Sequence, residues 1–441
     1  MGTGIEPTLS PRLNINESSE PSRRTVLIVL AIALVFVFVT RWPVARTKAL
    51  ESDEFGFLDQ TLTLWFPMHH TLFMTFGRLL GQLCGDPYEG FILLDMLTSA
   101  GALVSVWWWL RAISRPATAA AGALVLGVGP VFWGYGAMAG NYTAIVLVGA
   151  FLLGIAYRGR SCPRAWYPYA AALTLAIGTG YRQDIGTLWL PVFGVILWQN
   201  RWKHALQACL LFTILNLAWL SAMLYDVGGW AHYRAVSAEY AYRCGYLNSY
   251  WNLGFINAPA RYAVKLGMAL LWTLGPALLF FPRGAIRLRR VDRGGFLGFL
   301  FVISVIPALT SHLLVQFGVP GWSFHYVPTL IALLAIGIGR AQNHELEPRP
   351  LAFRFRGMFY QPAARLIAIA VLLAAVFWYY PTDYAQPGWR GSFDLAFSRF
   401  TRIGLKTPMP DHAPLYWRTP NSRPIAGTSV RPPREVPAGS G

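Results

Sequence analysis

The chain has 441 residues, of which 55% are hydrophobic and only 13% are charged. Soluble domains carry about 25% charged residues, so this composition excludes an ordinary soluble enzyme and indicates a polytopic helical membrane protein. The formal net charge is +17, but the cations lie in short connections between apolar runs and no nucleic-acid motif is present, which disfavours a nucleic-acid partner.

The N-terminal part combines a polar leader, one apolar run and a long loop. Residues 1–24 contain three prolines and end in two arginines, which predicts a disordered cytoplasmic leader. The apolar run 25–41 predicts the first membrane span; a cleaved signal peptide is the alternative, disfavoured because no small-x-small cleavage pattern is present. In the following loop, 42–88, segments 55–66 and 71–84 have mixed faces and predict helices lying on the bilayer surface.

Ten further apolar runs predict the remaining membrane spans, each near the ~20 residues needed to cross a bilayer. They lie at 89–110, 117–135, 142–157, 166–180, 184–199, 204–224, 260–281, 294–317, 324–340 and 364–380. The predicted fold is an all-α polytopic membrane protein of about eleven transmembrane helices, with a transmembrane domain over 25–380 and a second large outer loop at 225–259. Segment 178–186 fits either a tight outer turn or a break within a re-entrant pair.

The positive charges indicate which ends of the predicted spans face the cytoplasm. Every short connection placed inside carries at least two cations, whereas 136–141 and 318–323 carry none. Cytoplasmic loops are enriched in Lys and Arg, so the N-terminus is expected in the cytoplasm. Residues 381–441 are then an extracytoplasmic tail; they contain ten prolines, which predicts that the end of the tail is disordered.

In this predicted topology, several acidic residues and one arginine do not serve as topology signals, and they lie at or near the outer face. Asp53 and Glu54 follow the first span, where a partly desolvated carboxylate suits a general base; a solvated loop whose acids only aid solubility is the alternative. Arg182 suits the binding of a phosphate. The alternative is that Arg182 pairs with Asp184 only to fix a turn. Asp95 lies about two turns inside the second span, which makes it a functional candidate with Arg182 as the candidate partner.

Histidines and one tyrosine add weaker candidates. His325 and Tyr326 open the tenth span, where they suit phosphate or metal binding or simply an interfacial anchor. His69 and His70 are supporting candidates only. Adjacent histidines seldom ligate one ion and no HExxH spacing is present, so no metal ligand is assigned.

The four cysteines form no CxxC pair, which disfavours a structural zinc site. Cys84 and Cys244 both fall outside on this map, and outer compartments permit disulfides. The sequence leaves open whether these two cysteines form a disulfide bridge or stay independent thiols.

The chain resembles the GT-C superfamily of integral-membrane glycosyltransferases, in particular the bacterial branch related to dolichyl-phosphate-mannose protein mannosyltransferases. The residues that carry the resemblance are Ser-Asp-Glu at 52–54, Phe-Pro-Met-His-His at 66–70, Gly-Asp-Pro at 85–87, Gly-Tyr-Arg-Gln-Asp at 180–184 and His-Tyr at 325–326. The likeness spans roughly residues 25–340. The order Pro67-Met68-His69-His70 departs from the family, which usually has a small or apolar residue after the loop proline, and puts the role of the two histidines in doubt.

The resemblance implies a polyprenyl-phosphate sugar as donor and transfer on the extracytoplasmic side of a bacterial inner (plasma) membrane. It implies Asp53 as the catalytic acid, with Glu54 less favoured, and Arg182 as the phosphate-binding cation. The acceptor can be a lipid, a glycan or a protein, and in-line attack would invert the anomeric centre. No cofactor is assigned, and a divalent metal stays open.

Two other functions fit the sequence less well. A transporter or flippase of lipid-linked sugars needs polar residues along a path through the membrane, and the inner halves of the spans are almost free of charge. A non-catalytic member of the superfamily is the second alternative.

Overall fold

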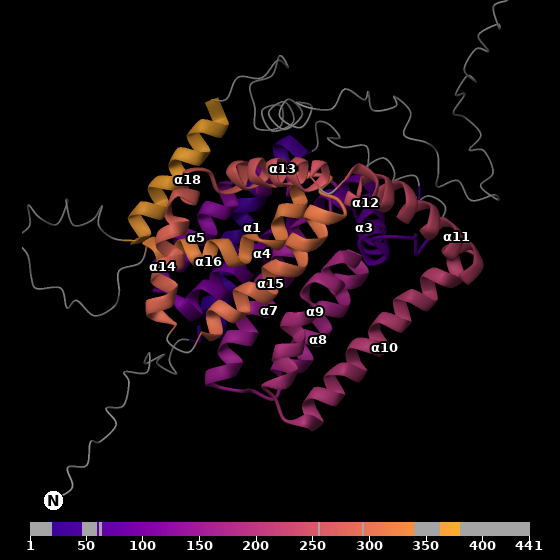
Figure 1. Ribbon diagram of the computed structural model, residues 1–441, viewed down its shortest axis with the longest axis horizontal. Coiled ribbons are helices and arrows are strands. Elements are labelled where there is room, and N and C mark those ends of the chain that lie inside the picture. Colours follow the sequence, from indigo (N-terminus) through magenta and orange to yellow (C-terminus); the bar gives the residue numbers. More distant parts are fainter. Residues whose placement is uncertain are drawn as a thin grey trace, which may run out of the picture.

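The computed structural model describes residues 20–45, 60, 64–254, 256–292, 295–338 and 362–379. Within these residues all regular structure is helical (Figure 1). Six helical segments are long and apolar enough to cross a membrane: Arg23–Trp42, Pro87–Ile113, Thr143–Ser161, Trp202–Asp226, Asn257–Arg289 and Phe296–Leu314. The protein is therefore an all-α polytopic integral membrane protein, as predicted, while the count of eleven spans stays a prediction.

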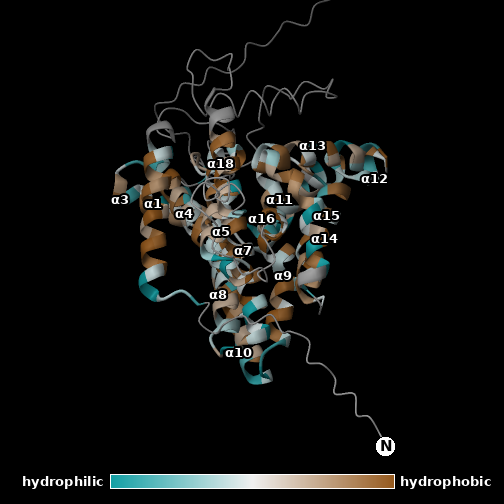
Figure 2. Ribbon diagram, turned by 90° about the vertical axis from the view of Figure 1, so that its left-hand side faces the viewer, coloured by the Kyte–Doolittle hydropathy of each residue, from teal (hydrophilic) through white to brown (hydrophobic). Residues whose placement is uncertain are grey.

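The first half of the chain supplies most of the central bundle. Its helices are α1 (Arg23–Ala45), α3 (Thr71–Cys84), α4 (Pro87–Ile113), α5 (Pro116–Val128), α6 (Pro130–Tyr135), α7 (Thr143–Ser161), α8 (Tyr167–Tyr181), α9 (Gln183–Trp198) and α10 (Trp202–Asp226). Figure 2 shows hydrophobic residues running along α1, with hydrophilic residues at its lower end. The predicted surface helix 71–84 coincides with α3. Of the predicted helix 55–66, residues 64–66 are not helical, and all the others except Gln60 lie outside the described residues.

The second half begins with a largely helical segment where the loop 225–259 was predicted. Its elements are α11 (Trp230–Tyr240), the π-helix η2 (Ala241–Gly245), the 3₁₀-helix η3 (Tyr246–Asn248), α12 (Tyr250–Leu253), α13 (Asn257–Leu274), the 3₁₀-helix η4 (Gly275–Phe280), α14 (Phe281–Val291), α15 (Phe296–Leu314), the 3₁₀-helix η5 (Pro320–His325), α16 (Val327–Ile338) and α18 (Pro362–Tyr379). The tail 381–441 and residues 1–19 of the predicted leader lie outside the described residues. α1 begins at Arg23, inside the predicted leader.

Helix α4 is the centre of the bundle, because α1, α3, α5 and α7 all pack against it. Glycines bring α3 very close: a Cβ on Gly90 would lie 2.2 Å from the backbone nitrogen of Gly81. Small residues allow membrane helices to approach closely and gain dispersion energy. This contact holds the C-terminal part of α3 against the bundle, and His69 and His70 directly precede the first residue of that helix, Thr71.

Three predicted spans have different boundaries in the structure. The run 117–135 is divided into α5 and α6 at Pro130, since proline lacks the N–H that would continue the helical hydrogen bonds. The run 260–281 is interrupted at Gly275, whose φ of +50° favours glycine; α13 lies across the top of the bundle in Figure 1 before η4 and α14 continue. The run 324–340 begins earlier than predicted, as the 3₁₀-helix η5, and α16 starts at Val327.

Candidate active site

Arg182 is the single residue between α8 and α9, so segment 178–186 forms a tight turn between two helices. Its backbone is extended, with φ −156° and ψ 114°. Its N–H donates to the carbonyl of Gly178 at 2.7 Å, and its carbonyl accepts from the N–H of Ile185 at 3.1 Å. Both helices therefore hold the backbone of Arg182 in place.

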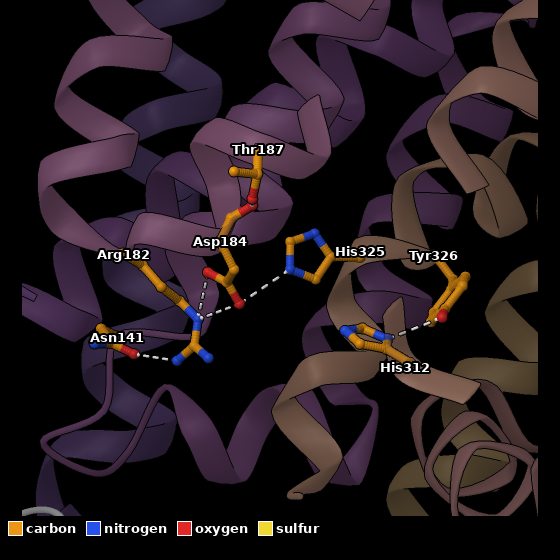
Figure 3. Close-up of polar contacts among 7 residues, drawn as sticks. All are labelled: Asn141, Arg182, Asp184, Thr187, His312, His325 and Tyr326. Carbon is orange, nitrogen blue, oxygen red and sulfur yellow. Dashed lines mark hydrogen bonds and ion pairs between the residues drawn. The ribbon is translucent and has the colours of Figure 1, made fainter. Parts of the chain in front are cut away.

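Three neighbours fix the Arg182 side chain, which is only 5% exposed. Its Nε lies 2.9 Å from the Asp184 carboxylate, and its Nη1 donates to Asn141 Oδ1 at 2.7 Å (Figure 3). The guanidinium carbon lies 4.0 Å from the centre of the Tyr142 ring. These contacts set the plane of the cation and leave further N–H donors for an anionic ligand.

Asp184 connects Arg182 to the second half of the chain. Its carboxylate lies 3.4 Å from Nε2 of His325, a fully buried side chain at the end of η5. The Thr187 hydroxyl donates to the Asp184 backbone carbonyl at 3.1 Å and steadies the first turn of α9. Two of the predicted residue pairs, 182/184 and 325/326, thus meet at one place (Figure 3).

Tyr326 is connected to the Arg182–Asp184–His325 cluster through His312, a residue that the sequence analysis missed. His312 Nδ1 lies 2.9 Å from the Tyr326 hydroxyl, and its ring is stacked on Trp322 at 5.3 Å and lies 5.6 Å from the His325 ring. His312 is an ionisable residue inside the predicted span 294–317, which is the signal that could have found it. Asn141 was also missed, and a lone amide in a short connection gives little signal.

His69 and His70 lie beside the same cluster. Both have positive φ, 53° and 45°, which is uncommon outside glycine and marks local strain of the kind found at functional sites. His69 is hydrogen-bonded to Gln183, and its ring lies 4.6 Å from that of Tyr240 on α11. Burial, followed by the charges of Arg182 and His69, holds the pKa of His70 well below its ordinary value. A neutral imidazole therefore stands next to the Arg182–Asp184 pair at neutral pH.

The other predicted residues have different outcomes. Asp95 is buried in α4 and accepts a hydrogen bond from Thr143 at 2.6 Å, so it reaches Arg182 through an intervening segment rather than through the expected direct pair. Asp53 and Glu54 lie outside the described residues. Cys84 is a free, exposed thiol, so the bridge to Cys244 is not formed. Among the described residues, no group of three or more His, Cys, Asp or Glu side chains could hold a metal ion.

The cluster suits recognition of an anionic oxygen. It has one permanently charged arginine with a fixed plane, and the neighbouring imidazoles offer hydrogen-bonding groups. Fixed donors in a water-poor site stabilise a developing negative charge more strongly than they would in water. The described residues therefore form an arginine-centred polar cluster suited to binding an anionic oxygen.

Comparison with solved structures agrees with this architecture. The chain is similar to the crystal structure of ArnT from Cupriavidus metallidurans in the apo state, at 14% identity over 85% of this chain and 69% of that one, with a TM-score of 0.51. It is also similar to the same protein bound to undecaprenyl phosphate, at 14% identity over 86% of this chain and 76% of that one, with a TM-score of 0.54. The chain therefore shares its fold with these ArnT structures. No protein-family model and no curated protein matches the sequence.

Proposed function

We propose that this protein is a membrane glycosyltransferase that moves a sugar from a polyprenyl-phosphate donor to an acceptor hydroxyl. The observation that carries the proposal is the fixed Arg182, held by Asp184, Asn141 and Tyr142 within the fold shared with ArnT. A similar structure, ArnT, is described as bound to undecaprenyl phosphate. The cation and the fold together favour a lipid phosphate as the anion that Arg182 recognises.

In the proposed reaction, Arg182 binds the donor phosphate and Asp53 acts as the base. The acceptor oxygen forms a bond to the anomeric carbon while its proton moves to the Asp53 carboxylate. The bond between the anomeric carbon and the phosphate oxygen breaks, and its electron pair leaves on the polyprenyl phosphate, whose charge Arg182 stabilises. Attack from the face opposite the leaving group inverts the anomeric centre. Glu54 is the alternative base.

The proposed location follows from the distribution of cations along the chain. The N-terminus lies in the cytoplasm and the Arg182 cluster faces the extracytoplasmic side of a bacterial plasma membrane. The acceptor is a lipid, a glycan or a protein hydroxyl.

The test is turnover of defined polyprenyl-phosphate sugars by the purified protein in proteoliposomes. The wild type should release polyprenyl phosphate from at least one donor, and Asp53→Asn should slow the release by about 10² or more, the usual scale for losing a general base. Glu239→Gln, which changes an exposed carboxylate on α11, is the matched control. Passage of intact donor across the bilayer without cleavage would instead identify a transporter.

A further inference from the structure

A buried polar cluster in the middle of the bundle is connected to Arg182 through the segment 141–143. At its centre is Asp95, fully buried in α4. The Thr143 hydroxyl donates to Asp95 Oδ1 at 2.6 Å, the Thr98 hydroxyl donates to the same oxygen at 3.1 Å, and the two hydroxyls lie 2.8 Å apart. A carboxylate inside a membrane helix is expensive to bury and usually serves a function.

Thr143 connects Asp95 to the surroundings of Arg182, because it directly follows Asn141 and Tyr142, the two residues that hold the guanidinium. Asn141 accepts from Arg182 Nη1, and the Tyr142 ring lies beneath the cation. Tyr142 is also wedged against η5: a Cβ on Gly321 would lie 2.4 Å from a carbon of its ring. The segment 141–143 therefore touches both Arg182 and the element that carries His325.

We propose that Asp95 is a positioning residue that sets the geometry of the anion site from inside the membrane. Its hydrogen bond to Thr143 fixes Asn141 and Tyr142 against Arg182. Asp95 itself does not touch the ligand. The inference about the site rests on the proposed role of Arg182 in binding a lipid phosphate.

The first test uses the Thr143 hydroxyl, which can be removed without changing a charge. Thr143→Val should weaken binding of undecaprenyl phosphate in nanodiscs by about tenfold, the scale of one hydrogen bond to a charged group. Thr143→Ser keeps the hydroxyl and should restore binding to within about twofold. Binding is measured below the unfolding temperature of each variant, so a loss of stability alone does not move it. Equal binding by the wild type and Thr143→Val would overturn the inference.

The second test needs no ligand and so separates this inference from the proposed function. The free energies of unfolding of Thr143→Val, Arg182→Lys and the double variant form a double-mutant cycle. Non-additivity above about 0.5 kcal/mol, the limit expected for independent sites, is the predicted result. Additive effects would show that Thr143 does not position Arg182. If the wild type fails to bind undecaprenyl phosphate but the cycle is non-additive, the proposed ligand is wrong and the positioning role stands.

Discussion

Replacing Arg182 with lysine tests whether the guanidinium binds the donor phosphate. The arginine reaches Asp184 through Nε and Asn141 through Nη1, and it has N–H groups left for a ligand. Lysine keeps the charge but has no planar fork, so it cannot serve both neighbours and the phosphate with the same geometry. Loss of one hydrogen bond to a charged group costs about 1.5–3 kcal/mol, which corresponds to roughly 10- to 150-fold weaker binding.

Affinity for undecaprenyl phosphate in nanodiscs is the appropriate measurement, because it does not depend on the base or on the acceptor. Arg234→Lys is the matched control, since Arg234 is an exposed arginine on α11. Arg182→Ala is a less clean variant: it leaves the partly buried Asp184 carboxylate without its cation, and breaking such a pair costs about 3 kcal/mol or more. An Arg182→Lys variant that binds with wild-type affinity would leave Arg182 with a structural role only.

Three further predictions concern other parts of the chain. Glu54→Gln should keep near-normal turnover while Asp53→Asn loses it; the reverse result would move the base to Glu54. The unfolded state takes up a proton on His70 near pH 6.5, whereas the folded state does so only well below that. The free energy of unfolding should therefore fall as the pH drops below about 6.5, and less steeply in His70→Gln; identical thermal denaturation profiles between pH 5 and 7.5 would refute this. A membrane-impermeant thiol reagent applied from outside should label the exposed Cys84 and never Cys162, with Cys84→Ser as control; labelling of Cys162 would overturn the topology.

The helical class and most helix positions could be predicted because a long apolar run has few stable alternatives in a membrane. The apolar run 204–224, which lies within α10, is the clearest case. The exceptions are local: Pro130 ends one helix within a continuous apolar run, and Gly275 turns the chain through a positive φ. Hydrophobicity averaged over a window does not register either residue, although each has a simple stereochemical reason.

The candidate site could be predicted where single residues carried an unusual charge. Arg182, Asp184 and His325 were found this way, and the structure brings them together. Asn141 and His312 were not found, because their roles come from contacts between helices that are distant in sequence. The expected direct pair of Asp95 with Arg182 was wrong in detail, since the hydrogen bond goes to Thr143.

Transfer of a labelled sugar in right-side-out membrane vesicles tests the central claim most directly. A polyprenyl-phosphate sugar, labelled in the sugar and delivered to the outer leaflet, should give label on an acceptor in vesicles that contain the wild type. Vesicles that contain Asp53→Asn should give about 10² less. Equal transfer by both proteins, or label that enters the vesicle lumen still attached to the polyprenyl phosphate, would contradict the assignment as an extracytoplasmic glycosyltransferase.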